Sequence, residues 1–181
     1  MSKVMKETIS TLAYLLGVLC VTWLVITFVG QRTKVDGSSM EPMLSNGDNL
    51  IVDKISYRFS DPKRYDIIVF PFKYEENTYY IKRIIGLPGE TVQIDEQGSI
   101  YINGELLEES YGREIIKPDN IGIAREPILL GEDEYFVMGD NRNNSTDSRT
   151  AVVGNIHRED IIGRAWVRIW PLSKIGILRH Q

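Results

Sequence analysis

The sequence has few of the residues on which many enzymes build thiol or metal chemistry. Among its 181 residues there is one cysteine, Cys20, and there are two histidines, His157 and His180. A single cysteine excludes an intramolecular disulfide and a metal site built on cysteines. The two histidines have no ligand-like spacing, so we expect solvated or capping roles for them. A serine hydrolase built on this chain would therefore need a general base other than histidine.

The sequence also lacks a basic block. It carries 21 Lys and Arg against 25 Asp and Glu, a formal net charge of -4. The basic residues stand singly among acidic ones, and no aromatic stripe is interleaved with them, which argues against a nucleic-acid partner.

Charge is absent altogether from residues 8–31. This apolar stretch of about 24 residues would reach roughly 36 Å as a helix, enough to cross a bilayer. It is apolar all round, unlike an amphipathic core helix. It also ends without the small-residue Ala-x-Ala pattern of a cleaved signal peptide. The pattern favours an uncleaved transmembrane anchor.

We therefore predict two parts: residues 1–31 as an N-terminus and anchor, and residues 32–181 as one globular domain. Lys3 and Lys6 before the span are balanced by Arg32 and Lys34 after it, so charge does not decide the orientation.

The domain is predicted to be mainly β, with at most short helices. Runs rich in Ile, Val, Tyr and Phe are bounded by Gly, Pro, Asn and Asp, which is typical of strands. They lie at residues 49–55, 65–72, 78–85, 91–95, 99–104, 134–138 and 162–170, with a hairpin turn between the fourth and the fifth. Residues 108–126 have no clear period and are expected to form an irregular surface excursion.

Lys82 lies within one predicted strand, where alternate residues share a face. Tyr80 and Ile84 flank it on its own face. A lysine in such surroundings is desolvated, its pKa falls, and its neutral amine can act as a general base. Taken alone, Lys82 is better explained by a stem packed on the sheet with the ammonium in water.

Two loops are rich in polar residues. Residues 35–44 hold hydroxyls in a Gly-containing turn, which can present a serine and aim backbone N–H groups at an oxyanion, although an ordinary turn explains them as well. Residues 139–149 are dense in Asn, Asp, Ser and Arg. A calcium loop does not fit there, because Ser145 stands where that loop needs glycine and Ala151 where it needs glutamate.

Together these segments resemble the bacterial type I signal peptidases, in a short form like that of Gram-positive bacteria. The similarity rests on Gly-Ser-Ser-Met-Glu-Pro at 37–42, Tyr-Ile-Lys-Arg-Ile-Ile-Gly-Leu-Pro-Gly at 80–89, and Gly-Asp-Asn-Arg-Asn-Asn-Ser-Thr-Asp-Ser-Arg at 139–149. Their order and their position after an anchor agree with that family.

The resemblance implies a role for each matching residue. Ser39 would be the nucleophile, with its backbone N–H donating to the oxyanion, and Lys82 would be the general base. Ser145 would hydrogen-bond the Lys82 amine and orient it, and Asp147 and Arg149 would form a supporting ion pair. Substrate would be bound by Val35, Gly37, Met40 and Tyr80.

The chain departs from the family pattern at three positions. Gly37 stands where some members carry a serine that is the second oxyanion donor. Asn143 replaces an aspartate, and Met43 replaces a threonine. We expect these changes to tune the site without abolishing it.

The implied activity is that of a membrane-bound serine endopeptidase that removes signal peptides from exported preproteins, after small residues of the Ala-x-Ala type. It needs no cofactor. Its partners would be preprotein signal peptides, the lipid bilayer and, by proximity, the secretion machinery. The N-terminus would be cytoplasmic and the domain extracytoplasmic, at the cell membrane.

Three alternatives agree less well with the sequence. A self-cleaving Ser/Lys protease of the SOS-repressor type is disfavoured by the anchor and by the lack of a DNA-binding helix pair. The reticulum enzymes of eukaryotes place histidine where Lys82 stands. A membrane-tethered β domain that binds partners without chemistry leaves the joint occurrence of the three segments unexplained.

Overall fold

The computed structural model describes residues 3–24 and 30–178. It begins with one helix, α1 (Lys3–Leu24), of 22 residues. At 1.5 Å per residue α1 is about 33 Å long. It is apolar and long enough to cross a membrane, and none of its residues is buried against the domain. The predicted apolar helix is confirmed, while the end of the predicted span, residues 25–29, lies outside the described residues.

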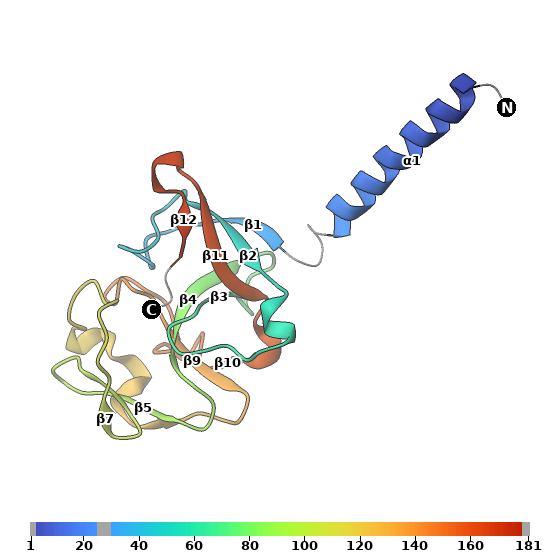
Figure 1. The fold of residues 1–181 in the computed structure, drawn as a ribbon. Helices are drawn as coiled ribbons and strands as arrows, with labels where there is room; N and C mark the ends of the chain where they lie inside the picture. Colours follow the sequence, from blue (N-terminus) through green and yellow to red (C-terminus); the bar gives the residue numbers. More distant parts are fainter. Residues whose placement is uncertain (1–2, 25–29, 179–181) are drawn as a thin grey trace.

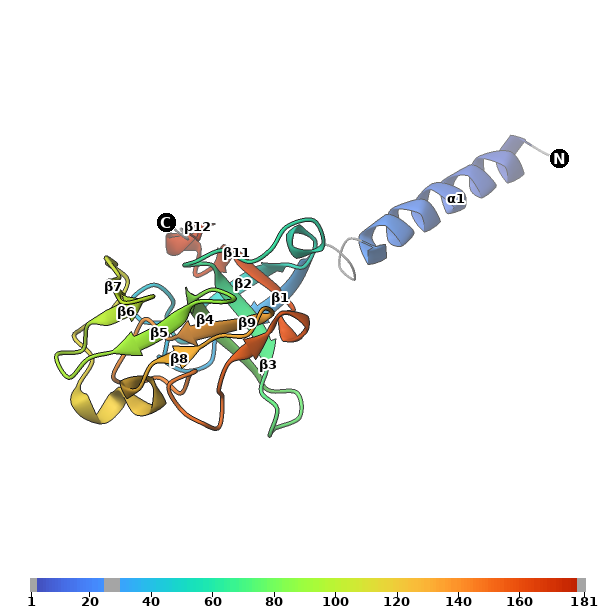
Figure 2. The same cartoon turned by 90° about the horizontal axis from the view of Figure 1, so that it is seen from below.

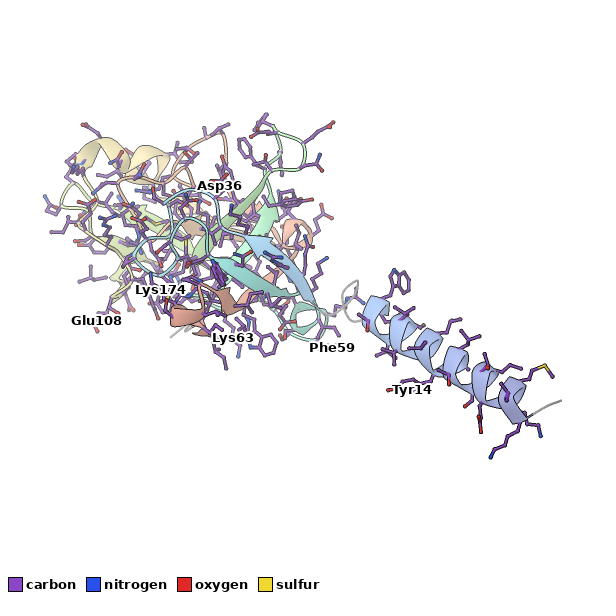
Figure 3. The ribbon with its side chains drawn as sticks, turned by 90° about the horizontal axis from the view of Figure 1, so that it is seen from above. Tyr14, Asp36, Phe59, Lys63, Glu108 and Lys174 are labelled. Carbon is purple, nitrogen blue, oxygen red and sulfur yellow. The ribbon has the colours of Figure 1, made fainter. Side chains whose placement is uncertain are left out.

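The polar side chains within α1 are hydrogen-bonded along the helix itself. Thr8 Oγ1 donates to the Val4 carbonyl at 2.9 Å, and Thr11 Oγ1 donates to the Glu7 carbonyl at 3.0 Å. Such bonds satisfy a hydroxyl without water. In Figure 3 the side chains of α1, Tyr14 among them, stand out on all sides of the helix.

The larger sheet of the domain has eight strands and is shown in Figure 1. Seven follow the order β1-β2-β11-β3-β4-β9-β10, and β12 pairs with β11; every described pairing is antiparallel. The strands are β1 (Gly30–Lys34), β2 (Asn49–Asp53), β3 (Ile67–Pro71), β4 (Tyr79–Gly86), β9 (Glu134–Met138), β10 (Ile156–His157), β11 (Gly163–Trp170) and β12 (Gly176–Ile177).

A smaller sheet stands on one side of the larger one, as Figure 2 shows, and has the order β7-β6-β5-β8. Its strands are β5 (Thr91–Ile94), β6 (Ile100–Ile102), β7 (Glu105–Leu106) and β8 (Ile128–Leu129). Asn103 and Gly104 both have positive φ and form the tight turn between β6 and β7. This is the turn that an Asn-Gly pair favours in a hairpin.

The mainly β prediction is confirmed. Every run predicted as a strand contains one, and residues 108–126 form no strand but include two short 3-10 helices, η3 (Pro118–Asn120) and η4 (Gly122–Arg125). The other 3-10 helices are η2 (Ser56–Arg58), η5 (Arg158–Asp160) and η6 (Leu172–Lys174). The strands that were not predicted are β7, β8, β10 and β12, of two residues each, and β1. A two-residue strand has no periodicity to read, and β1 begins at Gly30, inside the segment assigned to the anchor.

Strand β4 joins the three hydrophobic clusters of the domain. Ile81 packs with the cluster under the N-terminal strands, Ile84 with a second cluster beside β3 and β9, and Ile85 with a third under the smaller sheet. All three side chains are buried. Because side chains of β4 are packed into all three clusters, a residue in its middle, such as Lys82, has little freedom to move toward solvent.

Phe136 on β9 tests this core. Its side chain is fully buried in the cluster under the smaller sheet, whereas Phe59 is 85% exposed. We expect Phe136→Ala to lower the free energy of unfolding by about 3–5 kcal/mol, because it leaves a cavity. Phe59→Ala is the matched control and should change it by less than about 0.5 kcal/mol. Denaturant unfolding of the two variants in detergent checks this, and equal stabilities would contradict the described packing.

Candidate active site

The centre of the site is a hydrogen bond between Lys82 and Ser39. Lys82 Nζ lies 2.8 Å from Ser39 Oγ, although the two residues come from β4 and from the loop of residues 35–44, here called the serine loop. The Lys82 side chain is 4% exposed. Its Nζ also lies 4.9 Å from the centre of the Tyr80 ring, on the shared face that strand alternation predicts. That ring is stacked on Phe72, with centroids 4.6 Å apart.

Burial changes the acidity of Lys82. Desolvation is the largest cause and lowers the pKa of its amine from 10.5 to about 8; Arg149 acts in the same direction, while Asp147 and Asp140 partly oppose it. A group with this pKa carries a substantial neutral fraction near neutral pH, so its lone pair can accept a proton. The alternative of an ammonium that reaches water does not fit the buried side chain.

The serine loop is anchored on both sides of its nucleophile. Val35, Met40 and Leu44 are buried in the core cluster under the N-terminal strands. The Val35 N–H donates to the Asp48 carbonyl at 2.8 Å. Gly37 has φ of 93°, a conformation that favours glycine, and its N–H donates to Asn46 Oδ1 at 3.1 Å. Ser39 thus sits in a turn that the core fixes before and after it.

Residues 139–149, here called the polar loop, hold the serine loop from the other side. Asn141 donates from its backbone N–H to the Ser39 carbonyl at 3.0 Å, and from its side chain to the Ser38 carbonyl at 3.1 Å. Asn144 Nδ2 donates to Ser38 Oγ at 2.9 Å. The sequence alone assigns no individual role to Ser38, Asn141 or Asn144. It indicates them only as members of the two polar motifs.

The ion pair of Asp147 and Arg149 is present and bidentate. Arg149 Nε donates to Asp147 Oδ1 and Nη2 to Oδ2, both at 2.8 Å, and both residues are buried. Asp147 Oδ2 also accepts from the Gly139 N–H at 3.0 Å. Burial alone would raise the pKa of Asp147, but Arg149 and the Gly139 N–H outweigh it and hold that pKa below its ordinary value. Asp147 therefore links the start of the polar loop, at Gly139, to its end, at Arg149.

Ser145 lies beside the dyad but does not bond to it here. Its Oγ is buried and makes no hydrogen bond to any described residue, so the predicted bond to Lys82 is not formed in this structure. The hydroxyl lies near the Asp147 carboxylate, whose pKa it helps to lower, but outside hydrogen-bonding geometry. Its role in orienting Lys82 stays a prediction.

A second buried ion pair, missed from the sequence, lies behind the dyad. Arg83 Nε and Nη2 donate to the two carboxylate oxygens of Asp140 at 2.8 and 2.7 Å, and Nη1 donates to the Tyr65 carbonyl at 2.9 Å. The guanidinium carbon is 3.9 Å from the centre of the Tyr111 ring. Lys82 and Arg83 are adjacent on β4 but bind different partners. Lys82 contacts Ser39, whereas Arg83 binds Asp140 at the start of the polar loop.

A groove of about 550 Å³ opens at the dyad. It is lined by residues 33–40, 77–82 and 144–146. The residues predicted to bind substrate, Val35, Gly37, Met40 and Tyr80, all line it. Strand β9 pairs only with the second half of β4, from Arg83 onward, so the edge at Tyr79–Lys82 has no strand partner on that side among the described residues.

Within the described ranges 3–24 and 30–178, no cluster of three or more His, Cys, Asp or Glu side chains is arranged to hold a metal ion. The chemistry to be explained is that of a serine hydroxyl, a buried amine and an open strand edge. A serine hydroxyl beside a buried amine is the arrangement that activation of a serine nucleophile by an adjacent base would require.

Comparisons with known proteins show the family of this chain. Residues 6–170 match the family model described as signal peptidase, peptidase S26. The chain therefore belongs to the peptidase S26 family of signal peptidases. The family and the hydrolase class predicted from the sequence are confirmed.

Several signal peptidase sequences are similar over most of their length. The chain is 44% identical to a probable signal peptidase I-2 of Synechocystis sp., over 84% of this chain and 68% of that protein. It is 45% identical to a signal peptidase I of Leptolyngbya laminosa, over 84% and 74% respectively. With a signal peptidase I P of Bacillus subtilis subsp. natto it shares 38% identity over 87% and 86%. A crystal structure of a signal peptidase I from Enterococcus faecalis superposes with a TM-score of 0.47 at 35% identity, covering 58% of this chain and 97% of that one.

Gly139 offers a test of the described site. A Cβ at this position would overlap Ser145 Oγ and the Ser39 carbonyl, whereas a Cβ at Gly176 meets nothing within 4 Å. We expect Gly139→Ala to push the polar and serine loops apart and to lower kcat/KM about 100-fold, as a misplaced reactive group does. Gly176→Ala should leave it unchanged. Cleavage rates of the two folded variants measure this, and wild-type activity in Gly139→Ala would show that the loops are not packed as described.

Proposed function

We propose that this protein removes signal peptides from exported preproteins, with Ser39 as nucleophile and Lys82 as general base. The observation that carries the proposal is the 2.8 Å contact between Ser39 Oγ and the buried Lys82 amine, whose pKa burial lowers to about 8. Membership of the signal peptidase family supplies the substrate class.

The proposed reaction is acyl transfer in two steps. Lys82 accepts the hydroxyl proton as Ser39 Oγ attacks the carbonyl carbon of the scissile bond. The resulting ammonium gives that proton to the departing amine, which leaves as the new N-terminus of the mature protein. Lys82, neutral again, takes a proton from a water molecule that attacks the acyl ester. The ammonium then returns this proton to Ser39 Oγ as the ester bond breaks, and the signal peptide leaves with a new carboxyl terminus.

The oxyanion needs donors close to the nucleophile. The backbone N–H of Ser39 makes no hydrogen bond within the described part of the chain, so it is free to donate to the oxyanion. Gly37 has no hydroxyl to offer, and the second donor would then be a backbone group or water.

The groove suits an extended peptide. A substrate strand can add to the unpaired edge of β4 at Tyr79–Lys82, where backbone hydrogen bonds give affinity and side-chain pockets give selectivity. Val35, Met40 and Tyr80 would form walls that admit small residues such as alanine at the first and third positions before the cut. One methylene too many there changes discrimination by roughly 1–3 kcal/mol.

Helix α1 would hold the enzyme at the membrane. Its length and apolar composition fit a span. By the family resemblance, the N-terminus would lie in the cytoplasm and residues 32–181 outside. An enzyme and a precursor on the same bilayer meet at a raised effective concentration. The secretion machinery is then a partner by proximity, and no cofactor is required.

The test is cleavage of a fluorogenic peptide with an Ala-x-Ala site by the full chain in detergent. We expect kcat/KM to rise about tenfold per pH unit from pH 6 and to level off above a midpoint near the Lys82 pKa of about 8, because only the neutral amine is a base. Ser39→Ala and Lys82→Ala should each remove the activity while the domain stays folded.

Three results would contradict the proposal. A flat pH profile down to pH 5 removes Lys82 as the titrating base. Full activity in either variant, or an inert but folded wild type, favours the tethered domain that binds partners without catalysis.

A further inference from the structure

Residues 108–126, here called the strap, lie against the polar loop and not only at the surface. The strap carries η3 and η4, gold in Figures 1 and 2, and runs between β7 and β8 of the smaller sheet. Its Arg113 N–H donates to the Asp140 carbonyl at 2.9 Å, and its Glu109 Oε2 accepts from Arg142 at 2.7 Å. The Ile123 N–H donates to the Arg149 carbonyl at 2.9 Å.

One carboxamide makes three of the bonds between the two segments. Asn143 Oδ1 accepts from the Lys117 N–H at 2.9 Å and from Asn120 Nδ2 at 3.0 Å, and Asn143 Nδ2 donates to the Ile115 carbonyl at 2.8 Å. An amide supplies both the donor and the acceptor that this pattern requires, whereas a carboxylate would place an oxygen opposite the Ile115 carbonyl. The departure from the aspartate of the family pattern therefore matches the backbone of this chain's own strap.

The strap holds the polar loop on both sides of Ser145. Asn143 is fastened before it, and Arg149, after it, donates from Nη1 to the Asn120 carbonyl at 2.8 Å. Asn120 thus bonds to both arms of the turn, through its side chain to one and its backbone to the other. The turn between these arms lines the groove at the dyad.

We propose that Asn143 is a positioning residue, whose carboxamide fastens the polar loop to the strap and keeps that loop closed against Lys82. This inference rests on the proposed function, since its readout is the titration of the general base. Asn143 itself lines neither the groove nor the dyad.

The direction in which opening the polar loop shifts the Lys82 pKa follows from the groups around it. The groups that face Lys82 are the Ser39 hydroxyl, the Tyr80 ring and three charges, Asp140, Asp147 and Arg149. Moving the loop away weakens the effects of Asp147 and Asp140, which raise the Lys82 pKa, and the effect of Arg149, which lowers it, so these changes oppose each other. It also admits water, and desolvation is the largest of the causes. The Lys82 pKa should therefore rise toward 10.5 when the loop opens.

The experiment compares the pH profiles of kcat/KM for the full-length wild type, Asn143→Ala and Asn120→Ala. We expect the midpoint to move up by about 1 pH unit in Asn143→Ala and by less in Asn120→Ala, which deletes a single neutral partner of the same carboxamide. Asn155→Ala is the matched control: Asn155 Nδ2 bonds to Glu134 Oε2 at 2.8 Å, outside the groove lining, and its midpoint should stay in place. A loss of folded protein lowers the amplitude of a profile but not its midpoint.

The two proposals fail in different ways. If the wild type shows no alkaline midpoint, or Lys82→Ala remains active, the proposed function is wrong. If the wild type titrates as expected but both Asn143→Ala and Asn120→Ala keep its midpoint, the positioning role of Asn143 is overturned. Should Asn143→Ala fail to fold, Asn120→Ala decides alone: a raised midpoint supports the role and an unchanged one refutes it.

Discussion

The site depends on the removal of one lysine side chain from water. Lys82 is held on a strand whose neighbours pack into three hydrophobic clusters, and its amine is left with Ser39 and the Tyr80 ring as close partners. A buried charge is costly, so the lysine responds by losing its proton more readily. The hydrophobic core therefore lowers the pKa of the proposed base in addition to stabilising the domain.

Two loops far apart in the sequence have to meet at that amine. The serine loop is fixed by buried apolar residues, and the polar loop is fixed by paired charges, Asp147 with Arg149 and Asp140 with Arg83. The two buried pairs are hydrogen-bonded through two donors each, so each carboxylate of the loop is satisfied by its partner, one within the loop and one on β4. These pairs leave the pKa of Lys82 lowered because their opposite charges partly cancel, and desolvation remains the largest influence on that pKa.

Much of the fold and of the dyad could be predicted from the sequence. Strands of four or more residues have a readable alternation, and Lys82 with Tyr80 on one face followed directly from it. The pairing of Lys82 with Ser39 did not follow from any local pattern, because these residues are 43 positions apart; it came from the family resemblance. The sequence predicts the strap only as an irregular surface excursion. Its contacts with the polar loop could not be predicted, because they are made by backbone groups and single side chains that follow no periodic pattern. The bond from Ser145 to Lys82 was expected and is not formed here, as hydroxyl orientation depends on packing that sequence does not specify.

The most direct test of this account is the titration of Lys82 itself. In the full chain with nitrogen-labelled lysine side chains, the resonance of its amine can be assigned by its loss in Lys82→Met and followed by NMR against pH. The account predicts a midpoint near 8, well below the ordinary 10.5. A midpoint at the ordinary value, in a domain that is folded, would contradict the claim that burial makes Lys82 a base.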